Sequence, residues 1–309
     1  VVNADGTVSV VATSNISDSV GSEVVFNSGS TTHLDSAYDV ASGKVVVCYA
    51  DYTISGKGVA IVGTVSGTSI SFGSEVIYEN GNSTLENKII YDVNAGKVVI
   101  VYQDNSSGAV GQGKAIVGTV SGTSISFGTK VAITSGQTME NFGIVYDANA
   151  QKIAISFRDY TGSNYGACVV GTVSGTSISF GSKVVFNSAV TIKTAMSYDS
   201  TAQKIVLIYR DYGTTQGNSR VGTISGTSIS FGSEATFQNN QVDLVNCSYN
   251  ASADRTVLVY QNSNNNNITA CVGTVSGTSI SFGTAVEFDG NVQTPIGMAY
   301  DSNIQKTII

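Results

Sequence analysis

Four aspartates stand at equivalent places along the chain, each at the end of a short apolar segment such as KVVVCYAD or KIVLIYRD. Three of them are followed by a tyrosine, and a fifth segment ends in Asn262 instead. A carboxylate that accepts hydrogen bonds from sugar hydroxyls, beside an aromatic ring that stacks on a sugar face, would form a glycan contact. The same residues also suit a local role, because an aspartate can cap its own loop and a tyrosine can cover a strand edge. The residues are Asp51, Asp104, Asp159 and Asp211, with Tyr52, Tyr160 and Tyr212.

Two arginines, Arg158 and Arg210, directly precede two of these aspartates, where the other segments have alanine or glutamine. A guanidinium group at that place would bind an anionic group such as a sulfate or a uronate. Ordinary surface pairing with Asp159 and Asp211 is the alternative. We include both arginines in the candidate ligand-binding site.

Catalytic residues are harder to find, because a catalytic constellation would break the symmetry between repeated segments, and we find no such break. His33 is the only histidine, and its polar surroundings (STTHLDS) favour a solvated loop. Paired acids near a central axis stay open as a route to glycoside hydrolysis, although residue types alone do not give their separation. No phosphate loop, dinucleotide fingerprint or metal-binding run of acids is present. We therefore expect no enzyme activity, no cofactor and no metal.

The elements that position these residues follow from an internal repeat. The stretch GTVSGTSISFG begins at Gly63, Gly118, Gly171 and Gly273, recurs at Gly222 with one valine changed to isoleucine, and has a worn copy over residues 11–21. Neighbouring copies begin 51 to 55 residues apart. A period near fifty with strand-like content is typical of a propeller or a solenoid.

Four strand signals recur in each repeat. The first ends in a Tyr-Asp pair in five copies, and the second is apolar on both faces, as a strand between neighbours must be. A tight hairpin at Ser66-Gly67 then joins the third strand to the fourth. The fourth is predicted to be one continuous strand, because alternate residues from Ile70 to Tyr78 share an apolar face. This strand is expected to form the outer edge of a four-stranded blade.

These signals predict an all-β fold, a six-bladed β-propeller of about 52-residue repeats, as one domain over residues 1–309. The N-terminal and C-terminal strands would share the sixth blade and so close the ring. The predicted blades are residues 34–78, 85–133, 140–186, 192–237, 243–288, and 296–309 together with 6–27.

The loops of such a propeller divide between two faces. The Tyr-Asp turn and the SGTS hairpin share one face and hardly vary between copies. The loop after the second strand and the connection between blades share the other face, and these vary freely, as in DYTISGKG and NSNNNNITA. Variable loops on a repeated scaffold are where recognition usually takes place, so we expect ligands on that face.

Net charge and hydrophobicity argue against two classes of partner, nucleic acids and membranes. The formal net charge is -7 with a pI near 4.6, which disfavours nucleic acid, and no apolar run is long enough for membrane insertion. The four cysteines lack metal-site or disulfide spacing and are expected to be buried free thiols. Because the sequence opens VVNADG without methionine, we expect an upstream segment or a leader.

The pattern K-x-V-V-x-Y-x-D, a variable loop and then VGTVSGTSISFG resembles repeats of β-propeller proteins in marine bacteriophage virions, in tail fibres or other host-contacting components. The resemblance implies a structural virion protein or an adhesin. Our prediction is therefore a non-enzymatic adhesion propeller of a virion or an extracellular cell surface, which binds a surface glycan or a protein partner. The alternatives are a purely structural module that assembles with copies of itself or a larger assembly, and a propeller like those of glycoside hydrolases.

Overall fold

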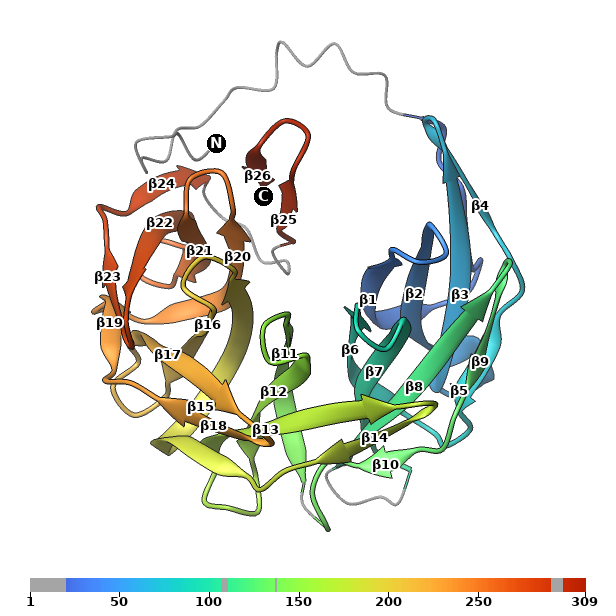
Figure 1. The fold of residues 1–309 in the computed structure, drawn as a ribbon, viewed down its shortest axis with the longest axis horizontal. Coiled ribbons are helices and arrows are strands. Elements are labelled where there is room, and N and C mark those ends of the chain that lie inside the picture. The colour runs from blue at the N-terminus through green and yellow to red at the C-terminus, as the bar shows by residue number, and fades with distance from the viewer. Residues whose placement is uncertain (1–20, 107–110, 137, 290–296) are drawn as a thin grey trace.

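The computed structural model of the protein describes residues 21–106, 111–136, 138–289 and 297–309. These residues form antiparallel sheets that stand around a common centre (Figure 1). The only helix among the described residues is a 3-10 turn, η2 (Tyr52–Ile54). These residues therefore contain no helix that is long and apolar enough to cross a membrane. The prediction of an all-β fold is confirmed.

Each complete blade places its first strand nearest the centre and its hairpin at the outside (Figure 1). The first blade consists of β1 (Thr31–Asp39), β2 (Lys44–Asp51), β3 (Lys57–Ser66), β4 (Ser69–Phe72) and β5 (Val76–Glu79). The second consists of β6 (Thr84–Asp92), β7 (Lys97–Asp104), β8 (Gln112–Ser121), β9 (Ser124–Phe127) and β10 (Val131–Ala132).

The remaining complete blades keep the same order. The third has β11 (Met139–Asp147), β12 (Lys152–Asp159), β13 (Tyr165–Ser174), β14 (Ser177–Phe180) and the first part of β15 (Val184–Asp199). The fourth has the rest of β15, then β16 (Lys204–Asp211), β17 (Gly217–Ser225), β18 (Ser228–Phe231) and β19 (Ala235–Gln238). The fifth has β20 (Val242–Asn250), β21 (Arg255–Asn262), β22 (Asn267–Ser276), β23 (Ser279–Phe282) and β24 (Val286–Asp289). Because β15 serves two blades, these form a single nine-stranded sheet.

The prediction of one continuous fourth strand is wrong. In the first blade β4 pairs with the end of β3 and β5 pairs with its beginning, so the strand is broken between them. At the break the backbone N–H of Gly73 donates to the carbonyl of Val62 at 2.9 Å. The alternation of apolar residues continues across the break, which is why the pattern alone did not reveal it.

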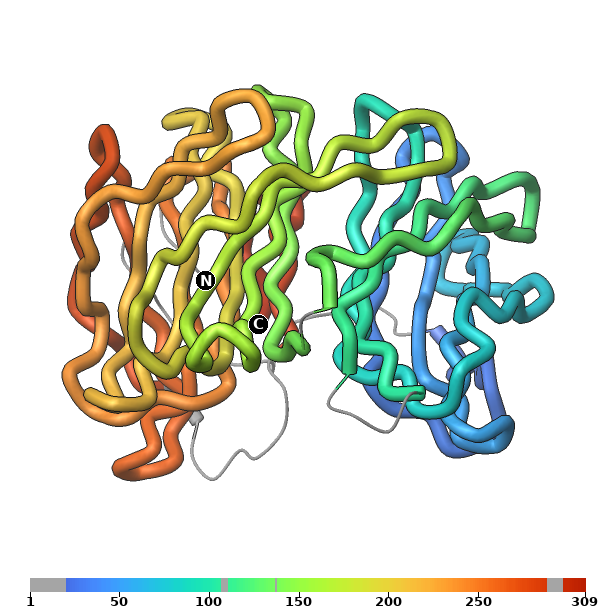
Figure 2. Tube along the Cα trace, turned by 90° about the horizontal axis from the view of Figure 1, so that it is seen from below, coloured from blue at the N-terminus to red at the C-terminus, as the bar shows by residue number. Residues whose placement is uncertain are grey.

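In the first four blades the glycine at the break lies against the hairpin of the next blade. A Cβ atom placed on Gly73 would lie 1.8 Å from the carbonyl oxygen of Thr123, where real contacts do not fall below 3.0 Å. Gly128 meets Thr176 in the same way, and Figure 2 shows the β13–β14 hairpin extending across to the second blade. The repeated GTS and FG elements therefore connect neighbouring blades.

The core lies between blades. The second strands are buried on both faces, so that Val99 and Val101 of β7 pack in one cluster with Ile153 and Ile155 of β12. Burial of such side chains contributes about 1.5 to 3 kcal/mol each. All four cysteines are buried and free, as predicted.

The predicted sixth blade falls only in part within the described residues. β25 (Ala299–Asp301) and β26 (Lys306–Ile308) form an antiparallel hairpin, and Asn250 Nδ2 of β20 donates to Thr307 Oγ1 at 3.2 Å. Of the predicted N-terminal strands, residues 6–20 lie outside the described residues, and residues 21–27 contain no strand. The six-blade count and the closure of the ring therefore stay predictions.

Candidate functional site

The innermost strand of each complete blade contains a bulge where its pairing with the second strand shifts register. One residue in each bulge has a left-handed backbone, with φ between 49° and 57°. Such a conformation is costly for residues other than glycine and tends to concentrate at functional sites. Each bulge residue lies five positions before the tyrosine that closes the strand, yet all five differ in type. They are His33, Glu86, Asn141, Lys193 and Leu244.

These five residues line one cavity of about 500 Å³. A neighbouring cavity of about 310 Å³ is lined by Asp35 and shares Lys88, Phe142 and Thr194 with the first. Because each of the five complete blades contributes its innermost strand, the cavities lie at the common centre of the sheets, and we call them together the axial cavity. The bulges occupy the half of the strand that pairs with the end of the second strand, on the side of the variable loops.

Two carboxyl groups from neighbouring blades lie in this axial cavity. Glu86 Oε2 accepts hydrogen bonds from the backbone N–H groups of Asn141 and Phe142 in the third blade. Asp35 Oδ2 accepts one from Ile89 of the second blade at 3.0 Å. Burial raises the pKa of both carboxyl groups above their ordinary values, and this outweighs the opposing effects of Lys88 and of the hydrogen bonds.

Two lysines line the axial cavity, and neither Lys88 nor Lys193 forms an ion pair among the described residues. Lys88 acts on both Asp35 and Glu86, because its charge lowers the pKa of each against the effect of burial. Burial, and then Lys88, lower the pKa of His33, so that its imidazole is neutral at pH 7. Lys193 belongs to the fourth blade, where it lies in the part of β15 that pairs with β16.

Two carboxyl groups with raised pKa values in adjoining cavities can serve acid–base chemistry, and glycoside hydrolysis is one reaction that uses such a pair. Our expectation that no side chains break the symmetry of the repeat is therefore wrong, because the bulge position does so in all five complete blades. Alignment of the copies on their Tyr-Asp pairs would have revealed it. No cluster of three or more His, Cys, Asp or Glu side chains suited to a metal occurs in the part of the chain that the structure describes.

The four aspartates predicted from sequence are buried at the base of the variable loops, where each accepts hydrogen bonds from its own loop. Asp51 Oδ1 accepts from Thr53 N at 2.8 Å, and Asp211 Oδ1 accepts from Gly213 N at 2.8 Å. Asp104 accepts from Ser106 N at 3.0 Å and Asp159 from Gly162 N at 2.9 Å, and these two also pair with Lys114 and Lys183. Their local role is thus established, and contact with a ligand stays a prediction.

The predicted tyrosines, Tyr52, Tyr160 and Tyr212, are exposed at the surface. The guanidinium group of Arg158 lies 5.1 Å from the ring centroid of Tyr160, and that of Arg210 lies 5.5 Å from the ring centroid of Tyr212.

The arginines do not pair with the aspartates beside them. Arg158 pairs with Glu140, and Arg210 pairs with Asp243 at 3.0 Å. Each of these acids directly precedes a bulge residue. The predicted arginines therefore adjoin the axial cavity through their acidic partners.

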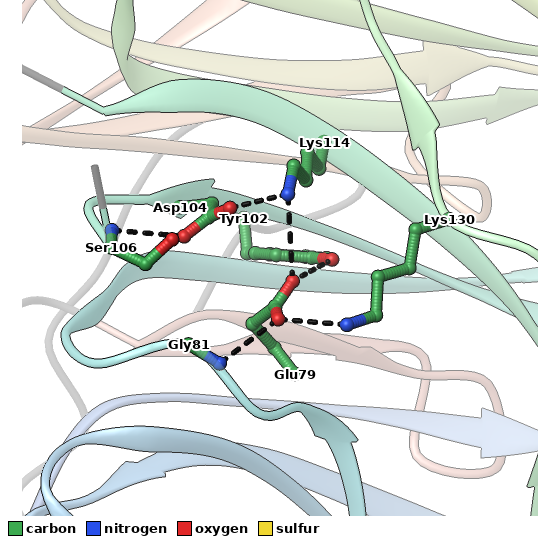
Figure 3. Close-up of polar contacts among 7 residues, drawn as sticks. All are labelled: Glu79, Gly81, Tyr102, Asp104, Ser106, Lys114 and Lys130. Carbon is green, nitrogen blue, oxygen red and sulfur yellow. Dashed lines mark hydrogen bonds and ion pairs between the residues drawn. The ribbon is translucent and has the colours of Figure 1, made fainter.

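A further polar cluster joins the first two blades beneath the variable loops (Figure 3). Glu79 accepts hydrogen bonds from Lys130 Nζ at 2.7 Å, Gly81 N at 3.0 Å and the Tyr102 hydroxyl at 2.8 Å. Burial acts to raise its pKa, but these hydrogen bonds together lower it. Lys114 bridges the cluster to Asp104, so it fixes the base of one variable loop.

No protein-family model matches the sequence, and no curated protein matches it either. Two structures of an exo-β-1,3-galactanase from Phanerochaete chrysosporium with β-1,3-galactotriose match at 10% identity, with TM-scores of 0.50 and 0.53. They cover 88% and 94% of this chain, which spans 63% and 69% of their own length. A protein from Lactobacillus plantarum matches at 10% identity and a TM-score of 0.56, covering 87% of this chain and 74% of its own. A mutant of AofleA from Arthrobotrys oligospora matches at 9% identity and a TM-score of 0.53, over 84% and 72%.

At this level of identity the likeness shows the fold, which is β-propeller-like. The prediction of a non-enzymatic adhesion propeller is contradicted, because the matched structures include exo-β-1,3-galactanases, which are glycoside hydrolases. The prediction that the chain is not an enzyme is contradicted on the same ground. Among our readings the match favours the glycoside hydrolase-like one. The resemblance to virion proteins and the surface location stay predictions.

Proposed function

We propose that this protein hydrolyses a glycosidic bond in its axial cavity. The observation that carries the proposal is the pair of carboxyl groups, Asp35 and Glu86, which neighbouring blades bring into two adjoining cavities that share Lys88, and both of which have raised pKa values. A glycan substrate is supported by the fold likeness to exo-β-1,3-galactanases, two structures of which hold β-1,3-galactotriose. A cavity of about 500 Å³ is in the range of ordinary ligand sites.

Glu86 is suited to act as the proton donor. Its Oε2 atom is anchored by backbone N–H groups, whereas Oε1 accepts no hydrogen bond from the described residues. A raised pKa lets the acid hold its proton closer to neutral pH. In hydrolysis this proton passes to the glycosidic oxygen as the bond between that oxygen and the anomeric carbon breaks. Water then supplies the hydroxyl group that takes the place of the leaving group on the anomeric carbon.

Asp35 is suited to be the ionised partner. Its two oxygens accept hydrogen bonds from the backbone N–H groups of Ser36 and Ile89, and Lys88 lies near it. These interactions favour the carboxylate, although burial opposes them. The carboxylate would accept the proton of the attacking water or stabilise positive charge on the sugar ring.

Hydrolysis of a panel of polysaccharides that includes β-1,3-galactan tests this proposal. Glu86→Gln removes the acid–base group and keeps one oxygen, which can accept both backbone hydrogen bonds of Glu86 Oε2. Asp35→Asn removes the other acid–base group and keeps an acceptor for one of the two backbone N–H groups that Asp35 binds. We expect each variant to lose about 10²- to 10⁴-fold in activity. Glu287→Gln is the matched control, because Glu287 is exposed in the fifth blade. Equal activity of Glu86→Gln and the wild type would exclude the assignment, as would wild-type protein that cleaves no glycan.

We also propose that the N-terminal and C-terminal segments share a sixth blade. Two contacts support this closure. A Cβ atom on Gly21 would lie 1.6 Å from the carbonyl oxygen of Thr68, which repeats the contact between Gly73 and Thr123. The C-terminal hairpin, in turn, is bonded to β20 through Asn250 and Thr307.

Deletion of residues 1–27 tests the closure. The deletion should lower the midpoint of thermal unfolding and promote aggregation, because the outer strands of the sixth blade would be missing. Differential scanning calorimetry and light scattering would measure both effects. A truncated protein as soluble and stable as the full chain would rule the closure out.

A further inference from the structure

Positive charge in the axial cavity is divided between two lysines with different surroundings. Lys88 lies near both Asp35 and Glu86, since its charge affects the pKa of each. Lys193 lines the same cavity from the fourth blade. Its ammonium group has no ion-pair partner among the described residues. Lys88 forms no ion pair among these residues either, but its charge acts on the two carboxyl groups that we assign to catalysis. We therefore take Lys193 as the cation that an anionic ligand would meet.

The backbone holds Lys193 in a specific place. Its φ is 53°, a left-handed conformation that is uncommon for residues other than glycine. Support for it comes from the third blade, because Asn141 Oδ1 accepts a hydrogen bond from Lys193 N at 3.4 Å and Thr194 Oγ1 donates to Asn141 O at 2.6 Å. A strained residue fixed by its neighbours at a cavity wall is a preorganised contact.

The other bulge residues do not duplicate this charge. His33 is neutral at pH 7 because burial and Lys88 lower its pKa, and Asn141 and Leu244 carry no charge. An anionic group on a ligand would therefore find a partner at Lys193, which lines the same cavity as Glu86. An ammonium that lines a cavity is screened less by salt than one on an open surface, so its pairing with an anion is stronger.

We propose that the axial cavity binds an acidic sugar, whose carboxylate or sulfate group pairs with the Lys193 ammonium. This inference rests on the proposed function, because it names the substrate class of the same cavity. Lys193 would set specificity, and Glu86 would act on the glycosidic bond. A neutral glycan would leave the ammonium without a partner and would bind more weakly.

Isothermal titration calorimetry with three oligosaccharides tests the inference. The probes are a galacturonate trisaccharide, a sulfated galactan oligosaccharide and neutral β-1,3-galactotriose, at low and high salt. The Glu86→Gln protein serves as the host, so that binding is measured without turnover. At least one acidic probe should bind about tenfold or more tightly than the neutral one, and this preference should fall as salt rises. The two acidic probes distinguish a carboxylate from a sulfate.

Lys193→Gln should abolish the preference and Lys193→Arg should retain most of it. Glutamine is a suitable replacement because it adopts the same left-handed conformation elsewhere in this chain, at Gln151 and Gln203. Lys204→Gln, which removes an ammonium at the start of β16, is the matched control and should leave the preference intact.

Three outcomes would overturn the inference. They are equal binding of acidic and neutral probes, a preference that survives in Lys193→Gln, and no binding of any probe. Hydrolysis of a neutral glycan with no preference for acidic ones would overturn this inference alone and leave the proposed function standing. Loss of hydrolysis in the Glu86→Gln comparison is a separate measurement, so the two proposals can fail independently.

Discussion

Glu86 Oε2 accepts a hydrogen bond from the backbone N–H of Asn141, so that a side chain from one bulge holds the backbone of the next. Asn141 in turn accepts a hydrogen bond from the N–H of Lys193 through its Oδ1 atom. Three successive blades are thus linked through residues that all have left-handed backbones. The strain at each bulge is supported by its neighbour, which keeps the walls of the axial cavity in place.

The first prediction concerns the pH dependence of stability at Glu86. Its pKa in the folded protein is raised above the ordinary value of 4.5. The contribution of this group to the free energy of unfolding is therefore fully present below pH 4.5 and is lost as the pH rises through the folded pKa. Glutamine cannot titrate. The stability of the wild type relative to Glu86→Gln should fall from acidic to neutral pH, as urea denaturation would measure.

A matched comparison is Glu287→Gln, because hydrogen bonds from Asn265 and Asn267 lower the pKa of this exposed carboxyl group. The stability of the wild type relative to Glu287→Gln should therefore rise, and not fall, from acidic to neutral pH. A difference between wild type and Glu86→Gln that is constant with pH would contradict the burial of the Glu86 charge.

The second prediction separates the two arginines that the sequence singled out. Glu140, which pairs with Arg158, is one of the charges that raise the pKa of Glu86. Arg158→Met would leave Glu140 unpaired, so the pKa of Glu86 should rise further. The alkaline limb of the pH–activity profile should then move upward by about 0.5 pH unit. Carboxyl NMR of Glu86 gives the same readout without catalysis.

Arg210→Met is the control for this experiment. Arg210 has the equivalent place in the next blade and pairs with Asp243, which is not among the charges that act on Glu86. Both variants lose the contact with a neighbouring tyrosine ring. An equal shift in the two variants would mean that the effect does not pass through Glu140.

The strand order and the hairpins were predictable from sequence because they depend on contacts between residues close in the chain. The glycine of Ser66-Gly67 and the alternation around Ile70 are local signals of this kind. The axial cavity was not predictable in the same way. Glu86 and Asn141 are 55 positions apart, and they meet only when two blades pack side by side.

The bulges illustrate the same limit. Nothing in STTHLDSAYD alone indicates that His33 has a left-handed backbone, because the bulge arises from the register between β1 and β2. The loop aspartates, by contrast, were recognisable, since Asp51 caps a turn two residues on through local hydrogen bonds. Sequence thus identified the residues with local roles and missed those brought together by tertiary packing.

The third prediction concerns the Glu79 cluster (Figure 3). Hydrogen bonds lower the pKa of this carboxyl group despite its burial, so its contribution to stability is present above pH 4.5 and is lost as the pH falls through the folded pKa. Glu79→Gln would replace the carboxylate that pairs with Lys130 by a neutral amide, so the Lys130 charge would lose its ion-pair partner. The variant should be destabilised by about 1 to 3 kcal/mol at neutral pH and by less in acid. Urea denaturation at both pH values measures this.

The chain provides a matched site in the fifth blade. There Gln238 donates to the Tyr260 hydroxyl, and Ala285 and Thr269 stand where the second blade has Lys130 and Lys114. Gln238→Glu would place a carboxylate without a lysine partner, so it should destabilise the protein at neutral pH and less in acid. A stabilising effect of this change would show that the lysines do not account for the Glu79 cluster.

The fourth prediction concerns the contact between blades at Gly73. A Cβ atom there would lie 1.8 Å from the carbonyl oxygen of Thr123, and backbone cannot yield as the end of a flexible side chain would. Gly73→Ala must therefore push the hairpin of the second blade away from the first. We expect a loss of about 1 to 3 kcal/mol in the free energy of unfolding. Gly297→Ala is the control, because no atom lies within 4 Å of its Cβ position.

A second variant distinguishes this contact from backbone conformation. Gly67 has a φ of 58° with nothing within 4 Å of its Cβ position, so Gly67→Ala carries only the cost of a left-handed alanine, about 1 kcal/mol. Its effect should stay within one hairpin, whereas Gly73→Ala should also increase hydrogen exchange in β9 of the next blade. Because the FG and GTS elements recur in every complete blade, Gly128→Ala should reproduce the loss at the next boundary. If Gly73→Ala left exchange in β9 unchanged, the repeated motif would not be what joins the blades.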